Sequence, residues 1–406
     1  MEKFKLGIIG LGNRGKSMTD LLAEREDCSI VAVCDTYADR CDDMKERLAK
    51  YGHTPKAYES FEELIASPDV EVVFAFSAWE NHVPAAVAAM KAGKPVAFEV
   101  GGAYTVEDCI LLCETYRKTG TPAMMLENCC YGRVEQTLYS MNRHNVFGEL
   151  IAVCGGYNHD LRSEVSTGNE CRHYRLRNYR SRNCENYPTH ELGPLDVLLG
   201  IGHGNRFVSL SSFSSKSAGL DEYIRNHPET DQSLADGKWA QGDIVTTILT
   251  TSQGQSVRLT LDTTLPRPYS RGLELHGTRG WFSQDNMSVF TDADHKESDH
   301  FKWKNFWGNY SEYEEKYMPS LWREYLDAGI KKGHGGMDFL VLDSFLSAVR
   351  DADTVPIDIY DSAILMAVTP LSERSIKLGG MPVEFPDLTA GLENRATAKG
   401  KYALFN

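Results

Sequence analysis

The sequence predicts an α/β protein with two domains: an N-terminal doubly wound parallel sheet, and a C-terminal α+β domain with a large, mostly antiparallel sheet. A glycine-rich turn follows a short apolar run near the N-terminus. Strand and helix patterns then alternate as far as residue 128, which is typical of parallel sheets. Beyond that point, runs of strands have few helices between them. With 406 residues the chain is also longer than one hydrophobic core usually supports.

The N-terminal turn has the pattern of a dinucleotide-binding, Rossmann-type site. The apolar stretch Lys5–Ile9 ends in glycines spaced Gly-x-Gly-x-x-Gly, which permit a tight turn and a close approach of the backbone to a pyrophosphate. A second strand, Ser29–Asp35, ends in an acid where a ribose diol would lie. Asp35 favours NAD over NADP because its carboxylate repels a 2′-phosphate. Arg40, which follows closely in the sequence, keeps this preference moderate. The expected cofactor contacts here are Gly10, Gly12, Asn13, Arg14, Gly15 and Asp35.

Further alternating elements complete the N-terminal domain, residues 1–128. Val70–Phe76 is a continuous apolar run and predicts a strand buried on both faces. Asn81 and His82 follow it, before an expected helix Val83–Ala92, and are therefore expected to bind the cofactor at the carboxyl edge of the sheet. The other expected elements are helices from Asp39, from a Ser60 cap and from a Thr105 cap, and strands Val96–Glu99 and Ala123–Glu127.

The second domain, residues 129–406, is expected to bind substrate and to support oligomerisation. Ile151–Tyr157 has a strand pattern, and Ile244–Thr251 and Ser256–Thr263 predict a hairpin. Short strands are expected around residues 273–276, 281–282 and 289–290, and helices over 338–350 and 361–378. The aromatic stretch Ser298–Tyr325 is interpreted as a long excursion near a site or an oligomer contact.

Composition excludes several classes of partner. A net charge of -14 argues against nucleic acid or an anionic membrane surface, because both would repel the protein. The sequence contains no run of about 20 apolar residues, so no transmembrane helix is predicted. The N-terminus leads straight into a strand without the pattern of a secretion signal, and ten cysteines follow no regular framework. The sequence therefore predicts a cytoplasmic protein with reduced thiols.

Polar clusters in the second half contain proton carriers. Tyr187 and His190 are three residues apart and would face one way on a helical turn after Pro188. Histidine and tyrosine suit sugar chemistry, because protons must be moved by groups held within hydrogen-bond reach. No metal site is expected: paired zinc-ligand spacings do not occur, and Cys109 and Cys113 fit an apolar helix face. A Gly-x-Ser-x-Gly elbow of serine hydrolases does not occur either.

Several motifs resemble the Gfo/Idh/MocA oxidoreductase superfamily, and more closely glycoside hydrolase family 109, the NAD-dependent α-N-acetylgalactosaminidase-type enzymes. Most of that superfamily has Glu-Lys-Pro after the fifth strand, with the lysine at the hydride-transfer site. This chain has Glu99-Val100-Gly101, a departure shared with the glycosidase branch. Glu191 stands where that branch usually has glycine, which adds a carboxylate beside the expected base. The motifs that carry the resemblance are Leu126–Arg133, His159–Arg162, Asn186–His190, Asp262–Gly272 and Gly333–Asp338.

The resemblance implies glycoside cleavage without net redox change. Tightly bound NAD+ would take hydride from C3 of the sugar, a base would remove the acidified C2 proton, and the aglycone would leave from C1. Water would then add, and the hydride would return. The implied roles are as follows: His190, Tyr187 and Tyr269 are catalytic; Glu99 and Asn128 bind the cofactor; and Glu127, His159, Arg162, Arg271 and His334 bind substrate.

Two alternatives stay open at this stage. An NAD-dependent sugar or cyclitol dehydrogenase would accumulate NADH, and a non-catalytic sugar or nucleotide sensor would bind a glycoside without cleaving it. A manganese-dependent glycosidase acting on phosphosugars is disfavoured because its metal ligands are missing. The sugar, its anomer and its aglycone are not predicted, and the protein is expected to form a homo-oligomer, either a dimer or a tetramer.

Overall fold

The computed structural model describes residues 3–392 and 395–405. The chain divides into two compact units, each assembled from separate segments. Unit 1 comprises Met1–Tyr131, Glu324–Ile364 and Asn394–Asn406, and unit 2 comprises Gly132–Arg323 and Leu365–Glu393. The two units therefore alternate along the chain, and each later segment of unit 1 follows a segment of unit 2.

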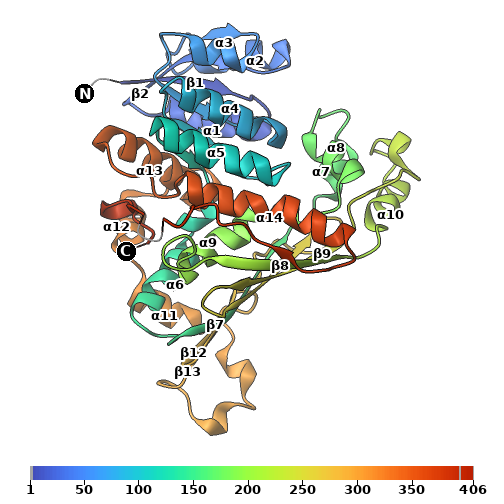
Figure 1. Ribbon diagram of the computed structural model, residues 1–406, viewed down its shortest axis with the longest axis vertical. Coiled ribbons are helices and arrows are strands. Elements are labelled where there is room, and N and C mark those ends of the chain that lie inside the picture. The colour runs from blue at the N-terminus through green and yellow to red at the C-terminus, as the bar shows by residue number, and fades with distance from the viewer. Residues whose placement is uncertain (1–2, 393–394, 406) are drawn as a thin grey trace. The chain divides into compact units, whose positions relative to one another are not determined.

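The sheet of unit 1 has six strands, all paired in parallel, in the order β3-β2-β1-β4-β5-β6. Its central strands are apolar and buried, as the continuous apolar runs predict. Helices pack on this sheet (Figure 1). The strands are β1 (Phe4–Ile9), β2 (Cys28–Cys34), β3 (Lys56–Tyr58), β4 (Val72–Ala75), β5 (Val96–Phe98) and β6 (Ala123–Met125). The helices are α1 (Asn13–Ala23), α2 (Ala38–Ala49), α3 (Phe61–Ala66), α4 (Trp79–Lys91), α5 (Val106–Thr119) and α13 (Met337–Asp351).

Local capping signals place the helices of unit 1. The Ser60 hydroxyl accepts a hydrogen bond from the Glu63 amide at 3.2 Å and begins α3. Thr105 and Asp108 form a reciprocal capping box at the start of α5. Helix α4 starts at Trp79, four residues before the expected start at Val83, so the helix prediction was short at this end. Asn81 and His82 consequently lie within its first turn rather than in the preceding loop.

The sheet of unit 2 has eight strands in the order β13-β12-β11-β7-β10-β9-β8-β14. Among the described strands of this second sheet, only β7 and β10 pair in parallel, which confirms the mostly antiparallel prediction. The expected hairpin is β9 and β10, and β8 was not predicted. The strands are β7 (Leu150–Asn158), β8 (Phe207–Ser214), β9 (Ile244–Thr251), β10 (Ser256–Asp262), β11 (Glu274–Gly277), β12 (Gly280–Ser283), β13 (Ser288–Thr291) and β14 (Val383–Glu384).

One face of this sheet is covered by α9 (Thr189–Leu199), which lies directly against β7. Gly155 permits this contact, since a Cβ there would lie 2.9 Å from Glu191 Cβ. The contact holds the N-terminus of α9 beside the carboxyl end of β7. Other helices of unit 2 are α6 (Arg133–Arg143), α7 (Arg162–Ser166), α8 (Tyr174–Ser181), α10 (Gly219–Asn226) and α11 (Tyr310–Tyr317); α12 (Ser320–Ala328) and α14 (Ile359–Lys377) cross the boundaries between the units in sequence.

The expected excursion after β13 contains short 3-10 turns at Glu297–Asp299 and Trp303–Phe306, followed by α11 and α12. It is drawn in orange beside β12 and β13 in Figure 1. Among the residues that the structure describes, no helix is long and apolar enough to cross a membrane.

Candidate active site

The glycine turn between β1 and α1 has the shape that a pyrophosphate site requires. Gly10 has φ +89°, and a Cβ there would lie 2.5 Å from the backbone of Ser77. A Cβ on Gly15 would lie 2.1 Å from the carbonyl oxygen of Gly10. Both glycines are therefore needed by the protein's own packing. At Gly12 an added Cβ would meet only Arg40, at 3.6 Å, so space remains beside the start of α1 and Asn13.

The acid at the end of β2 is fixed beside this turn. Asp35 accepts hydrogen bonds from the amides of Leu11 at 2.7 Å and Tyr37 at 2.9 Å. The Arg40 guanidinium lies 3.6 Å from the same carboxylate and 4.8 Å from the centre of the Tyr37 ring. A carboxylate has about four acceptor positions, so two amide bonds leave capacity for a diol.

Arg14, the second residue of α1, joins two carboxylates within unit 1. Its Nε donates to Glu99 at 2.8 Å, and its Nη atoms donate to both oxygens of Asp338, at 2.7 and 2.9 Å. Asn128 Nδ2 also donates to Asp338, at 2.7 Å, and His334 Nδ1 lies 2.7 Å from it. Burial would raise the pKa of Asp338, but hydrogen bonds from His334 and Arg14 hold it well below its usual range. Glu99, Asn128 and Asp338 are buried, so their hydrogen bonds hold the Arg14 side chain in one position beside the glycine turn.

His82 lies within α4 and is buried, with Nε2 donating to the Ser77 carbonyl at 3.0 Å. Burial lowers the pKa of His82 from 6.5 to about 4. Asn81 is half-buried one residue before it. Through its bond to Ser77, His82 supports the segment whose backbone touches Gly10.

The neutral state of His82 predicts a pH dependence of stability. An unfolded chain binds a proton on this side chain near pH 6.5, whereas the folded protein binds it only near pH 4, so stability falls as the pH falls through this window. We expect a loss of about 3 kcal/mol from this group between pH 7 and pH 4, measured by denaturant titration at successive pH values. In His82→Gln this part of the dependence of the free energy of unfolding on pH should vanish. An unchanged pH dependence would show that His82 is not buried in its neutral form.

Unit 2 brings an aromatic–histidine cluster together at the carboxyl end of β7 and the start of α9. Tyr187 Oη and His190 Nε2 lie 3.4 Å apart, as their spacing predicts. Tyr157 Oη lies 3.0 Å from His159 Nδ1, and the Tyr157 ring lies 4.5 Å from the Tyr187 ring. The Tyr269 ring completes the cluster, with its centre 5.1 Å from that of His159. Several proton carriers are therefore held within contact of one another.

A buried arginine controls the charge of this cluster. The Arg175 guanidinium lies 5.1 Å from the centre of the Tyr187 ring and 2.6 Å from the Glu164 carboxylate. Burial, and next the positive charge of Arg175, lower the pKa of His159. His159 is therefore neutral near pH 7 and able to accept a proton. Burial raises the pKa of Tyr157 well above its usual value, so its phenol keeps its proton.

Arg271 connects this cluster to α6. Its Nε donates to Glu135 at 3.0 Å, and its Nη1 donates to Tyr269 Oη at 3.3 Å. Glu135 is fully buried. Arg271 thus orients Tyr269, while a buried acid compensates its charge.

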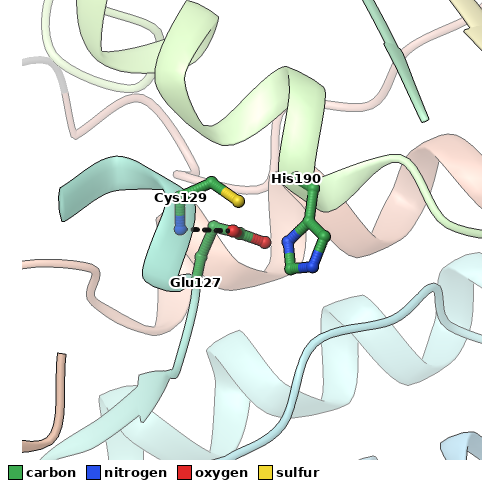
Figure 2. Close-up of side chains that lie close together, drawn as sticks. All are labelled: Glu127, Cys129 and His190. Carbon is green, nitrogen blue, oxygen red and sulfur yellow. Dashed lines mark hydrogen bonds between the residues drawn. The ribbon is translucent and has the colours of Figure 1, made fainter. Parts of the chain in front are cut away.

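The remaining expected substrate residues are divided between the units. Arg162 pairs with Asp160, Nε to Oδ1 at 2.8 Å, at the start of α7 in unit 2. Glu127 is buried in unit 1 after β6, where it accepts a hydrogen bond from the Cys129 amide at 3.0 Å; Figure 2 shows this bond, and His190 at the start of α9. His334 belongs to the Arg14 network in unit 1.

A group of metal-ligand types lies on adjacent strands β7 and β11. Ligand atoms of Cys154, Glu274 and His276 are all within 4.8 Å of one another. The Glu274 carboxylate also lies 3.8 Å from Arg258 and 3.7 Å from His276. Ion pairing of Glu274 with Arg258 on β10 and with His276 on its own strand accounts for the position of its carboxylate.

Sequence reasoning missed three residues of these sites as individual candidates. Asp338 stood inside a recognised motif and Tyr157 at the end of the predicted strand Ile151–Tyr157, but nothing in the pattern distinguished them from their neighbours. Arg175 lies on α8, which was not predicted, and an arginine in a polar stretch has the pattern of a solvated surface. Its burial depends on the pairing with Glu164.

Comparisons with known proteins agree with this arrangement. The family model for the oxidoreductase family, NAD-binding Rossmann fold, matches residues 4–126, and that for glycosyl hydrolase 109, C-terminal domain, matches residues 131–394. Among solved structures, the WlbA dehydrogenase of Bordetella pertussis, in complex with NADH and UDP-GlcNAcA, is similar with a TM-score of 0.69 at 14% identity, over 95% of this chain and 98% of that one. This likeness shows the shared fold.

Curated relatives are similar over nearly the whole chain. A glycosyl hydrolase family 109 protein of Stenotrophomonas maltophilia is 36% identical over 96% of this chain and 90% of its own length. An alpha-N-acetylgalactosaminidase of Tannerella forsythia is 35% identical over 95% of this chain and 86% of its own. The resemblance and the fold class predicted from the sequence are confirmed. A Rossmann domain for a nicotinamide cofactor precedes the hydrolase domain, and this chain belongs to the glycosyl hydrolase 109 family.

Proposed function

We propose that this glycosidase cleaves α-N-acetylgalactosaminides or closely related glycosides, with NAD+ held tightly and regenerated in each cycle. Residues 1–128 would bind the cofactor and residues 129–406 the substrate. The observation that carries the proposal is the aromatic–histidine cluster, which brings the phenols of Tyr157 and Tyr187 and the imidazoles of His159 and His190 together as proton carriers.

The glycine turn supports the dinucleotide part of the proposal. Gly12 is not required by packing, so its missing side chain is explained by a ligand that approaches the backbone closely. The amides at the start of α1 would bind the pyrophosphate, Asp35 the ribose diol, and the Arg14 network with Glu99 and Asn128 would line the nicotinamide end. Bound NAD+ supplies a hydride acceptor, and later a hydride donor, at C3 of the sugar.

The protein's own residues would carry the proton transfers. We assign removal of the C2 proton and protonation of the leaving oxygen at C1 to Tyr187 and His190, which are already in contact. His159, neutral because of burial and Arg175, would relay protons through Tyr157. Tyr269, oriented by Arg271, would hold a sugar hydroxyl. Arg162 is proposed to position the substrate from the start of α7.

The two glycines of the turn give a matched pair of variants. Gly12→Val should leave the thermal midpoint of the cofactor-free protein nearly unchanged but remove the dinucleotide that chromatography detects after denaturation. Gly15→Ala should lower the midpoint itself, because its Cβ would collide with the Gly10 carbonyl at 2.1 Å. Equal dinucleotide content in Gly12→Val and wild type would show that the dinucleotide does not lie against the backbone at Gly12.

A panel of nitrophenyl glycosides in both anomeric forms, with and without added NAD+, tests the function. We expect release of nitrophenol from the α-N-acetylgalactosaminide without net NADH absorbance, and exchange of the C2 proton with deuterium from solvent. Accumulation of NADH with free sugar and no cleavage would establish the dehydrogenase instead. Cleavage without exchange would exclude the elimination route.

A further inference from the structure

A hollow lies in unit 2 between strands β12 and β13 and the excursion that follows β13. Its volume is about 350 Å³, within the range of ligand sites of about 300–1,000 Å³. Its lining is aromatic: Trp281, Phe290, His300, Trp303, Phe306 and Trp307. Trp303 and Trp307 are each more than half exposed, at 55% and 53%, although tryptophan is usually well buried. We name this hollow the aromatic pocket.

The walls of the aromatic pocket are held in place by the protein. Asn309 accepts from the Val289 amide and donates to its carbonyl, both at 2.8 Å, so the end of the excursion is tied to β13. Ser288 Oγ donates to the Phe306 carbonyl at 2.9 Å. The Phe290 and Phe306 rings meet edge to face, with centres 5.1 Å apart. These contacts hold the Phe290 and Phe306 side of the pocket in place before any ligand arrives.

The polar side chains that line the pocket are few, and the Lys304 ammonium lies 5.1 Å from the centre of the Trp303 ring beside them. Asn286 Oδ1 is buried and meets no hydrogen-bond donor among residues 3–392 and 395–405. An orphaned acceptor of this kind costs free energy unless a ligand supplies a donor. The lining side chains include no Asp, Glu, Lys or Arg in the described part of the chain. A ligand with an apolar face and neutral hydroxyl or amide donors satisfies both features.

We propose that the aromatic pocket binds a pyranose ring of a glycan, as a second carbohydrate site separate from the aromatic–histidine cluster. A pyranose presents C–H groups that stack on an indole face and hydroxyls at its edge that donate to Asn286. A charged ligand would lack a counter-charge in this lining. The choice of an N-acetylgalactosamine-containing glycan as the probe rests on the proposed function. The site would keep the enzyme near polymeric substrate without taking part in bond cleavage.

Affinity electrophoresis of the holoenzyme through native gels that contain gastric mucin tests this proposal, with serum albumin gels as reference. We expect mucin to retard the wild type, and Trp303→Ala/Trp307→Ala to bind mucin about tenfold more weakly because two stacking faces are lost. Phe301→Ala is the matched control, since Phe301 lies on the same excursion, is 94% exposed and is not part of the lining. It should migrate like the wild type.

Catalysis is followed separately, so that failure of this proposal is distinguished from failure of the glycosidase assignment. Both variants should release nitrophenol from a soluble glycoside at the wild-type rate. Equal retardation of the double variant, or retardation lost in His190→Ala instead, would overturn the proposal. A change from oligomer to monomer in the double variant, by light scattering, with mucin binding unchanged would assign the pocket to a second copy of the chain and also overturn it.

Discussion

His190→Ala loses about 10²-fold or more of kcat on the glycoside while keeping its bound dinucleotide. The imidazole is in contact with Tyr187 Oη at 3.4 Å, and both stand at the start of α9. Alanine removes the proton carrier while the close packing of α9 on β7, at Gly155 and Glu191, is unchanged. Steady-state kinetics and chromatography of the released cofactor measure the two expectations together.

A histidine elsewhere in unit 2 provides the control. His276 lies on β11, is exposed, and pairs with Glu274 at the surface. His276→Ala should keep the wild-type kcat. Tyr187→Phe should lose a large part of kcat with little change in dinucleotide content. Wild-type turnover in His190→Ala would remove this histidine from the mechanism.

Arg271→Met lowers the free energy of unfolding of unit 2 by about 3–5 kcal/mol, because it leaves the Glu135 carboxylate buried without its cation. The guanidinium is 11% exposed and Glu135 fully buried, so water cannot replace the lost partner. Five of the six tryptophans lie in unit 2, so denaturant titration followed by tryptophan fluorescence reports mainly on that unit.

Two further variants separate burial from charge. Glu135→Leu/Arg271→Met should be more stable than Arg271→Met alone, since no uncompensated charge remains. Arg258→Met removes an exposed arginine 3.8 Å from Glu274 in the same sheet, and should change stability by less than about 1 kcal/mol. If Arg271→Met and Arg258→Met lost the same free energy of unfolding, burial of the ion pair would not determine the loss.

Local patterns predicted the fold well because they act over few residues. The glycine turn, the Ser60 and Thr105 caps, and the β9–β10 hairpin each depend on neighbours within one turn or one loop. Tyr187 and His190 belong to the same class, since they are three residues apart across the N-terminus of α9. Helix α4 began earlier than expected because Pro84, at its sixth position, concealed the first turn.

Long-range pairs could not be predicted in the same way. Asp338 meets Arg14 across more than 300 residues, and Arg271 meets Glu135 across more than 130. In sequence, a charged residue with a buried partner has the same pattern as one in water. The Arg175–Glu164 pair was missed for this reason even though its members are near neighbours.

The three-part composition of unit 1 has a consequence for synthesis on the ribosome. Arg395, near the end of the chain, pairs with Asp358 and Asp361, and all three side chains are buried. A nascent polypeptide that has completed its first 131 residues still lacks the helix that carries Asp338, and once Asp358 and Asp361 have been made they wait for Arg395 to neutralise them. Unit 1 therefore completes its buried contacts late in synthesis, after most of unit 2 has been made.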